Sequence, residues 1–329
     1  MKAAVVLQLV QQVLLLLSVS EIEALAKASN EATASSTAST ILRRSRDYHL
    51  LEEVPHDTTS FTQGLTYFDG HIYEGTGMEH ESHLMRHDPS NHMKTLNKIP
   101  ITPSHLFGEG ISHYYVWKTA DDGNPIKEHR LIQLTWKDKI GKIYSLPEMQ
   151  LLKDFSYDTV TGEGWGITFV PNTNEFYVSD GSEYLMVWDA ETLEEKRRIA
   201  VTFEREAGTK DTVKYVNELQ FVDFGVDGSA DSVLGEYGEC KETCHSLFTP
   251  TMKILANVWY QDVLISIDPA SGSVDKVYDL RDIYPLEQRH KDADCLNGIS
   301  LAGDKKWDEG LEVWVTGKLW PKMYRIRLL

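Results

Sequence analysis

The sequence contains little positive charge and few cysteines. Its 329 residues include 33 Lys and Arg against 50 Asp and Glu, which gives a formal net charge of −17. A nucleic-acid partner requires a basic face, and no dense Lys/Arg run is present, so we exclude a nucleic-acid-binding function. For three cysteines in an oxidising compartment, one disulfide and one free thiol is the simplest count. Cys240 and Cys244 could form a local disulfide. With His245 they could instead form half of a zinc site, although no second Cys pair completes it. The disulfide state of Cys240, Cys244 and Cys295 stays open.

Long hydrophobic runs are also scarce, and the one present lies near the N-terminus. Lys2 precedes the run AAVVLQLVQQVLLLLSVS, and Ala24–Ala26 supplies small residues for a cleavage site. This pattern predicts a signal peptide over residues 1–26, with an uncleaved signal anchor as the alternative. Ser/Thr-rich residues 27–46 predict a flexible linker. We therefore expect a protein of the secretory pathway or the cell exterior that has no stable membrane association after cleavage.

Several catalytic motifs are missing. The sequence has no G-x-S-x-G elbow, no H-E-x-x-H pair and no phosphate-binding glycine loop, which argues against the hydrolases, zinc proteases and nucleotide-binding enzymes that carry them. One cluster of histidines suggests a metal site, namely His80, His83, His87 and His92. Their spacing does not place them on one face of a strand, so we expect a solvent-exposed edge instead.

A short phrase recurs along the chain and begins a strand-like run each time. It reads QGLT at 63, EGIS at 109, WGIT at 165, NELQ at 217 and NGIS at 297. A second run follows each phrase, and a third run in most units ends in turn residues such as Asp268–Pro269. Five such units in succession, with almost no helical periodicity between them, predict an all-β fold.

The number and size of the units favour a five-bladed β-propeller over residues 47–329. The last unit ends at its third strand, MYRIRLL, so we expect Tyr48–Val54 to supply the outer strand of that blade and close the ring. A β-sandwich with coincidental spacing is the alternative. Inserts at 113–130 and about 223–250 lengthen two units, and we expect both to form loops.

Alignment of the units brings one residue of each phrase to the central channel. These residues are Gln63, Glu109, Trp165, Asn217 and Asn297. A second register, counted back from the turn after each third strand, adds Trp136, Asp180, Trp259 and Lys318 to the same rim. An aromatic pocket with an acid, a lysine and amides is typical of a small-ligand site.

Some members of this set have other interpretations. Asp180, in the sequence SDGS, is expected to form a turn. Glu163 lies two residues before Trp165, and strand alternation would point both side chains the same way, so Glu163 competes with Glu109 for an acid role. The tryptophans could pack between blades, and the asparagines could bind backbone groups at strand ends. We interpret the glycines on both sides of Glu109 as room for a ligand to approach it.

Seven segments, in order over about residues 55–326, resemble the plant-type glutaminyl-peptide cyclotransferases, which are five-bladed β-propeller enzymes. The segments are FTQGL (61–65), FGEGI (107–111), LTWK (134–137), EGWG (163–166), NELQ (217–220), NVW (257–259) and LNGI…VTGKLWP (296–321). The resemblance implies conversion of the N-terminal glutamine of peptides or proteins to pyroglutamate with release of ammonia. It implies no metal and no other cofactor.

The resemblance also implies roles for individual residues. Glu109 would be the catalytic acid/base, and Lys318 and Asn217 would stabilise charge during the reaction. The substrate-binding residues would be Gln63, Phe107, Trp136, Trp165 and Trp259. We expect a monomer, because a propeller buries its own sheet edges. The alternatives are a ligand-binding propeller without catalysis and a metal-dependent propeller hydrolase with a cation held at Glu109, Asn217 and Asn297.

Overall fold

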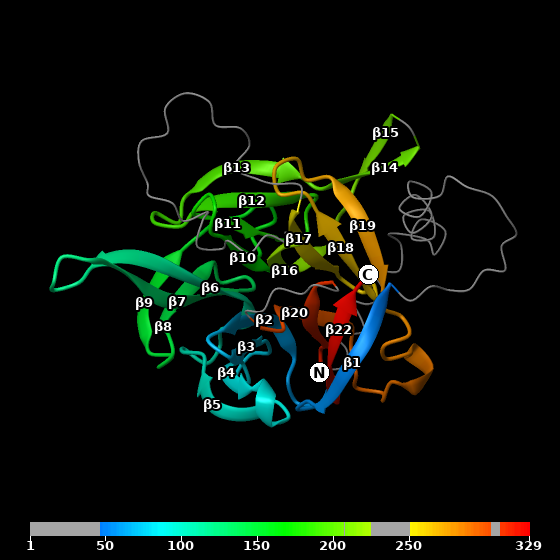
Figure 1. The fold of residues 1–329 in the computed structure, drawn as a ribbon, viewed down its shortest axis with the longest axis horizontal. Helices are drawn as coiled ribbons and strands as arrows, with labels where there is room; N and C mark the ends of the chain where they lie inside the picture. The colour runs from blue at the N-terminus through cyan, green and yellow to red at the C-terminus, as the bar shows by residue number, and fades with distance from the viewer. Residues whose placement is uncertain (1–46, 207, 225–250, 304–309) are drawn as a thin grey trace, which may run out of the picture.

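The computed structural model describes residues 47–206, 208–224, 251–303 and 310–329. The predicted signal peptide and linker, Cys240, Cys244 and most of the second insert lie outside these residues. Five four-stranded antiparallel sheets surround a common centre and form the five-bladed β-propeller that the repeat predicts (Figure 1). The β-sandwich alternative is wrong, because the sheets form a ring and not two stacked layers.

In each of the first four blades, the strands follow one another in chain order from the channel outwards. Blade 1 consists of β2 (Thr62–Phe68), β3 (His71–Thr76), β4 (His83–Asp88) and β5 (Lys94–Pro100). Blade 2 consists of β6 (Gly108–Thr119), β7 (Pro125–Thr135), β8 (Ile140–Ser145) and β9 (Leu151–Ser156). Blade 3 consists of β10 (Ile167–Val170), β11 (Glu175–Val178), β12 (Tyr184–Asp189) and β13 (Glu195–Ala200). Blade 4 consists of β16 (Val216–Asp223), β17 (Met252–Val258), β18 (Val263–Ile267) and β19 (Val274–Asp279).

Blade 5 is assembled from both ends of the described chain. It consists of β20 (Leu296–Leu301), β21 (Glu312–Gly317), β22 (Lys322–Leu328) and, as its outer strand, β1 (Tyr48–Pro55). Strands β1 and β22 pair antiparallel over their whole length and lie side by side in Figure 1. This confirms the predicted closure of the ring, in which β1 is the outer strand of the last blade.

The inner strands of adjacent blades approach each other closely at the glycines of the recurring phrase. A Cβ atom on Gly110 would lie 2.4 Å from the backbone oxygen of Trp165, and the Gly110 N–H donates a hydrogen bond to that oxygen at 2.7 Å. On the other side of Glu109, a Cβ on Gly108 would lie 2.6 Å from the backbone oxygen of Thr76. The interpretation of these glycines as room for a ligand is therefore wrong, because neighbouring backbone fills that space.

One blade breaks this glycine pattern. The second residue of the phrase is glycine in four blades, at Gly64, Gly110, Gly166 and Gly298. In blade 4 it is Glu218, which is fully buried and accepts hydrogen bonds from the N–H groups of Leu65 in β2 and Ile299 in β20. Burial raises the pKa of this carboxyl well above its usual value, and the two N–H groups oppose that rise. Glu218 thus ties the inner strands of blades 1, 4 and 5 together.

The first insert differs from the loop expected from the sequence. Residues 113–130 lie almost entirely in β6 and β7, which pair from Gly108 with Thr135 out to Thr119 with Pro125, so this insert is a long β-hairpin and the expected loop is wrong. A further hairpin, β14 (Thr202–Glu206) with β15 (Thr209–Thr212), connects blade 3 to blade 4 along the chain and projects outwards from the sheets (Figure 1). The described residues also include the short 3-10 helices η1 (Pro89–Asn91) and η2 (Leu286–Gln288). No helix among the described residues is long and apolar enough to cross a membrane.

Candidate active site

The ends of strands bring side chains from different blades to one end of the channel. Residues just before an inner strand are hydrogen-bonded to residues just after the second strand of the same blade. Thus Trp136 donates its backbone N–H to Phe107 O at 3.0 Å, and Trp259 donates its own to Tyr215 O at 2.8 Å. The residues of the two registers expected from the sequence therefore lie side by side at one end of the channel. Four blades supply side chains to the site through such pairs.

Glu109 is a buried acid of this site. It is the second residue of β6, is only 4% exposed, and accepts a hydrogen bond from Gln63 Nε2 at 3.0 Å. Burial raises the pKa of Glu109 well above its usual value; the positive charge of Lys318 opposes the rise and the negative charge of Glu163 adds to it. A carboxyl with a raised pKa is suited to both accepting and returning a proton during a reaction.

Two asparagines of the first register differ in their contacts. Asn297 Nδ2 donates to the backbone oxygen of Thr62 at 3.0 Å and lies 3.4 Å from Gln63 Oε1, so it ties a strand end, as one interpretation of the sequence expected. Asn217 is buried, and its Oδ1 atom, like that of Asn297, has no hydrogen-bond partner among the described residues. A buried acceptor without a partner is costly unless a ligand or water donates to it. Asn217 is therefore available to bind an N–H group of a ligand.

Lys318 supplies the positive charge of the site. It directly follows β21, and its backbone N–H donates to Cys295 O at 3.0 Å. Its side chain is buried, and Nζ lies 4.9 Å from the centroid of the Phe61 ring, close enough for a cation–π interaction. The ammonium group is thus held beside the pocket and acts on the charge of Glu109.

The walls of the site are aromatic and partly exposed. They consist of Phe61, Phe107, Trp136, Trp165, Tyr215 and Trp259. Phe107 lies between Phe61 and Trp136, with ring centroids 6.1 and 5.5 Å away. On the other side, Trp165 packs edge-on against Trp259 at 5.4 Å. Such rings can confine a small, partly apolar ligand while leaving a mouth open to solvent.

Glu163 joins these two groups of rings. Its Oε2 atom accepts hydrogen bonds from the indole N–H of Trp136 at 2.8 Å and of Trp165 at 2.9 Å, and its Oε1 atom lies 3.6 Å from Lys137 Nζ. Glu163 is in the loop before β10 (Ile167–Val170) and not in a strand, so strand alternation does not apply to it, but its side chain does lie beside that of Trp165, as expected. With a side chain that is 24% exposed, Glu163 is much less buried than Glu109 and is engaged in holding the indoles.

Two further interpretations of the sequence have structural answers. Asp180 accepts hydrogen bonds from the backbone N–H of Ser182 and of Thr161, which confirms its expected role in a turn. His87 is buried against Glu74, so the expectation of a solvent-exposed edge is wrong for this histidine. In the described part of the chain, no three His, Cys, Asp or Glu side chains form a group that could hold a metal ion.

Comparison with known proteins identifies the family. The family model described as glutamine cyclotransferase matches residues 21–228 and 242–328. The chain belongs to the glutamine cyclotransferase family. The glutaminyl-peptide cyclotransferase of Arabidopsis thaliana is 27% identical over 289 residues, which are 87% of this chain and 72% of that protein. The crystal structure of Myxococcus xanthus glutaminyl cyclase has the same fold, with a TM-score of 0.58 and 24% identity over 85% of this chain and 95% of that one.

In this family member, two aromatic residues of the site were not predicted from the sequence. Phe61 and Tyr215 each lie two residues before a residue of the first register, as Phe107 does. The signal was therefore present as a constant offset from the recurring phrase. It was masked because the same offset gives Glu163 in blade 3 and Cys295 in blade 5, so the residue type is not preserved around the ring.

Proposed function

We propose that this family member is a glutaminyl-peptide cyclotransferase, which converts the N-terminal glutamine of peptides or proteins to pyroglutamate and releases ammonia. The observation that carries this proposal is the environment of Glu109. A buried carboxyl with a raised pKa lies beside an amide donor and a lysine, beneath partly exposed aromatic rings. This is a chemical environment in which one proton can be moved between two nitrogen atoms of a small ligand.

In the proposed reaction, the neutral α-amine of the substrate attacks the Cδ atom of its own side-chain amide. As the new N–C bond forms, the amide oxygen gains negative charge and the Glu109 carboxylate takes a proton from the amine. Glu109 then returns this proton to the amide nitrogen, the C–N bond breaks, and ammonia leaves. A five-membered lactam remains, and the carboxyl group returns to its starting state.

Other residues of the site match the charges of this reaction. The Lys318 ammonium is suited to stabilise the negative oxygen of the tetrahedral intermediate, and one such donor typically contributes about 3–4 kcal/mol. The free Oδ1 atom of Asn217 is suited to accept a substrate N–H. The aromatic walls would favour the folded shape of the glutamine side chain over extended ones, which lowers the entropic cost of ring closure.

The test is ammonia release from a Gln-initiated dipeptide, measured for the unmodified protein and for Glu109→Gln. We expect turnover in the first and a loss of about 10²-fold or more in the second, since this is the usual contribution of acid–base catalysis. A chelator should have no effect. An unmodified protein that binds Gln peptides but releases no ammonia would overturn the proposal in favour of a ligand-binding propeller, and inhibition by chelator would indicate a metal-dependent enzyme.

We also propose that the protein enters the secretory pathway, on the basis of the apolar run at the N-terminus and the small residues at Ala24–Ala26. Expression of the full chain in a eukaryotic cell, followed by N-terminal sequencing of the protein from the medium, tests this. A mature N-terminus at Lys27 is expected, and recovery of an uncleaved chain in the membrane fraction would contradict it.

A further inference from the structure

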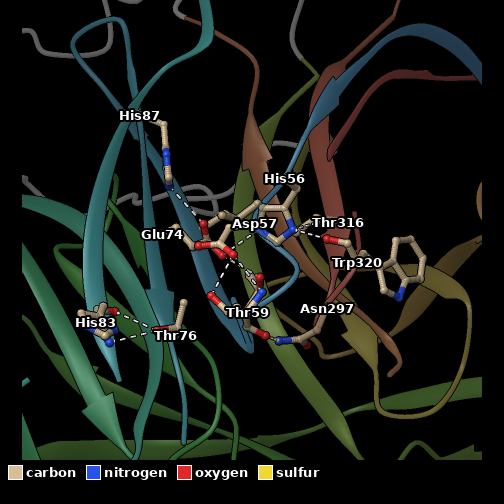
Figure 2. Close-up of polar contacts among 12 residues, drawn as sticks. His56, Asp57, Thr59, Glu74, Thr76, His83, His87, Asn297, Thr316 and Trp320 are labelled. Carbon is tan, nitrogen blue, oxygen red and sulfur yellow. Dashed lines mark hydrogen bonds and ion pairs between the residues drawn. The ribbon is translucent and has the colours of Figure 1, made fainter. Parts of the chain in front are cut away.

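A buried cluster of charged and polar side chains lies beside the chain segment that carries Lys318. Glu74 of β3 is fully buried between two histidines. Its Oε1 atom lies 3.0 Å from His56 Nε2, and its Oε2 atom lies 3.0 Å from His87 Nε2. Figure 2 shows His56 between Glu74 and the backbone of Trp320, with His87 reaching Glu74 from the other side. None of these side chains takes part in the reaction proposed above.

The hydrogen bonds determine the protonation of His56. Its Nδ1 atom lies 2.7 Å from the backbone oxygen of Trp320, which can only accept, so Nδ1 must carry a proton. Its Nε2 atom faces Glu74, whose two oxygens already accept from Thr62 Oγ1 and from His87. These donors stabilise the carboxylate form of Glu74, so Nε2 of His56 is a donor as well. His56 is therefore an imidazolium ion.

His87 differs from His56 in this respect. Its Nδ1 atom lies 3.1 Å from Thr95 Oγ1, and a hydroxyl can donate as well as accept. Neutral His87 can thus satisfy both of its nitrogens while it donates to Glu74. The hydrogen bonds therefore require a proton on both nitrogens of His56 but on only one nitrogen of His87, and the side chains of His56 and Glu74 are both buried.

The charged groups around His56 support this assignment. Burial by itself lowers the pKa of His56, but the charge and hydrogen bond of Glu74, the Trp320 oxygen and the more distant Asp57 outweigh it and raise the pKa. Burial likewise raises the pKa of Glu74, but His56 and His87 hold it far below its usual value. Both shifts favour the ionised pair.

His56 is one of three groups that donate hydrogen bonds to the carbonyl oxygens of the turn after β21. This turn consists of Lys318, Leu319 and Trp320, and Leu319 has a left-handed backbone with φ 61°. Each of its three carbonyl oxygens accepts a hydrogen bond: that of Lys318 from Asp294 N, that of Leu319 from His290 Nε2, and that of Trp320 from His56 Nδ1. At 2.7 Å, the bond from His56 is the shortest of the three, as expected for a charged donor.

The same cluster also contacts the other side of the site. Thr62, which donates to Glu74 at 2.7 Å, immediately precedes Gln63, the residue that donates to Glu109. The position of Glu74 is specific to blade 1. Residues paired with the inner strand at the equivalent place in the other blades are uncharged, namely Gln133, Val178, Ala256 and Val315.

We propose that His56 and Glu74 are a pair of positioning residues, whose buried ionic contact fixes the Lys318–Trp320 turn and so sets the position of the Lys318 ammonium relative to Glu109. The proposal rests on the function proposed above, because it assigns Lys318 a role in the reaction. Its physical basis is that a charge-assisted hydrogen bond to a backbone oxygen resists displacement more strongly than a neutral one.

The chain provides a matched control, because two histidines bind the same carboxylate. His56→Gln weakens the hold on the Lys318 turn, whereas His87→Gln removes an equivalent contact to Glu74 that does not reach the turn. We expect His56→Gln and Glu74→Gln to lower kcat at least tenfold with KM changed less than threefold. We expect the acidic limb of the kcat/KM profile to move up by about one pH unit, because a displaced Lys318 no longer opposes the raised pKa of Glu109. His87→Gln should leave both nearly unchanged.

Equal effects of the His56 and His87 substitutions, or a loss of kcat with an unshifted pH profile, would overturn the proposal and indicate a merely structural cluster. Carbon-13 NMR titration of the Glu109 carboxyl reads the same shift without turnover. If the protein does not cyclise Gln peptides, the proposed function is refuted. The NMR titration still tests whether His56 and Glu74 position Lys318, because it does not depend on turnover. Nitrogen-15 NMR of the histidine rings in the unmodified protein adds a test that needs no variant: a neutral His56 at pH 6 would overturn the proposal.

Discussion

The contrast between Glu109 and Glu163 gives the sharpest prediction about the site. Both are acids close to the aromatic pocket, but Glu109 is buried against Gln63, and Glu163 holds two indole N–H groups on one oxygen. We expect Glu109→Gln to abolish the proton transfer and lower kcat by about 10²–10⁴-fold. We expect Glu163→Gln to alter mainly the shape of the pocket, and therefore KM.

The size of the effect at Glu163 follows from its hydrogen bonds. A bond to a charged partner contributes about 1.5–3 kcal/mol and a bond to a neutral one about 0.5–1.5 kcal/mol, so each indole bond loses roughly 1 kcal/mol when the acceptor becomes an amide. With the partial exposure of Glu163 taken into account, the two bonds together lose about 1–2 kcal/mol. This corresponds to a KM increase of about five- to thirtyfold, with kcat within about threefold of the original.

The assay is steady-state ammonia release over a range of pH with a Gln-initiated dipeptide. Because the negative charge of Glu163 raises the pKa of Glu109, its removal should move the acidic limb of the kcat/KM profile to lower pH. A fall in kcat of more than 100-fold in Glu163→Gln, with KM unchanged, would refute the reasoning and assign the acid/base role to Glu163.

Three further outcomes are expected. Lys318→Met should move the same acidic limb to higher pH, the opposite direction from Glu163→Gln, and lower kcat by about 100-fold through loss of an oxyanion partner, as pH profiles of turnover will show. Glu218→Leu removes the acceptor of two buried N–H groups, so urea denaturation should show a loss of about 2–4 kcal/mol, and an unchanged midpoint would contradict its role between the blades. The His56–Glu74 pair should stabilise the fold most between about pH 4.5 and 6.5. Because the pKa of His56 is raised, the stabilisation that His56 contributes is lost as the pH rises above this range. Because the pKa of Glu74 is lowered, the stabilisation that Glu74 contributes is lost as the pH falls below it. Urea midpoints that are equal for His56→Gln and the unmodified protein at every pH would refute this dependence.

The recurring phrase predicted much of the architecture because every blade repeats the same order of strands and turns. A strand begins at the channel, and the position directly after the second strand lies beside it; Trp136 and Lys318 could therefore be placed at one rim from spacing alone. The closing strand could be predicted for the same reason, since the last unit lacked its outer strand.

What could not be predicted depends on contacts between residues that are distant in the sequence. The glycines beside Glu109 looked like room for a ligand because only the structure shows the backbone of the neighbouring strands. The burial of His87 depends on Glu74 in another strand, and the two indoles that bind Glu163 come from different blades. The long hairpin of β6 and β7 looked like a loop because its strands are mostly polar and partly exposed.

The pairing of β1 with β22 also imposes an order on folding. β1 leaves the ribosome first among the described strands and its partner leaves last, so the main-chain N–H and C=O groups of β1 stay unpaired through most of synthesis. Lys318 belongs to the same late segment, just before β22. The ring and the positively charged side of the pocket are therefore completed in one step, and a nascent chain that stops short of this segment has neither a closed ring nor a complete site.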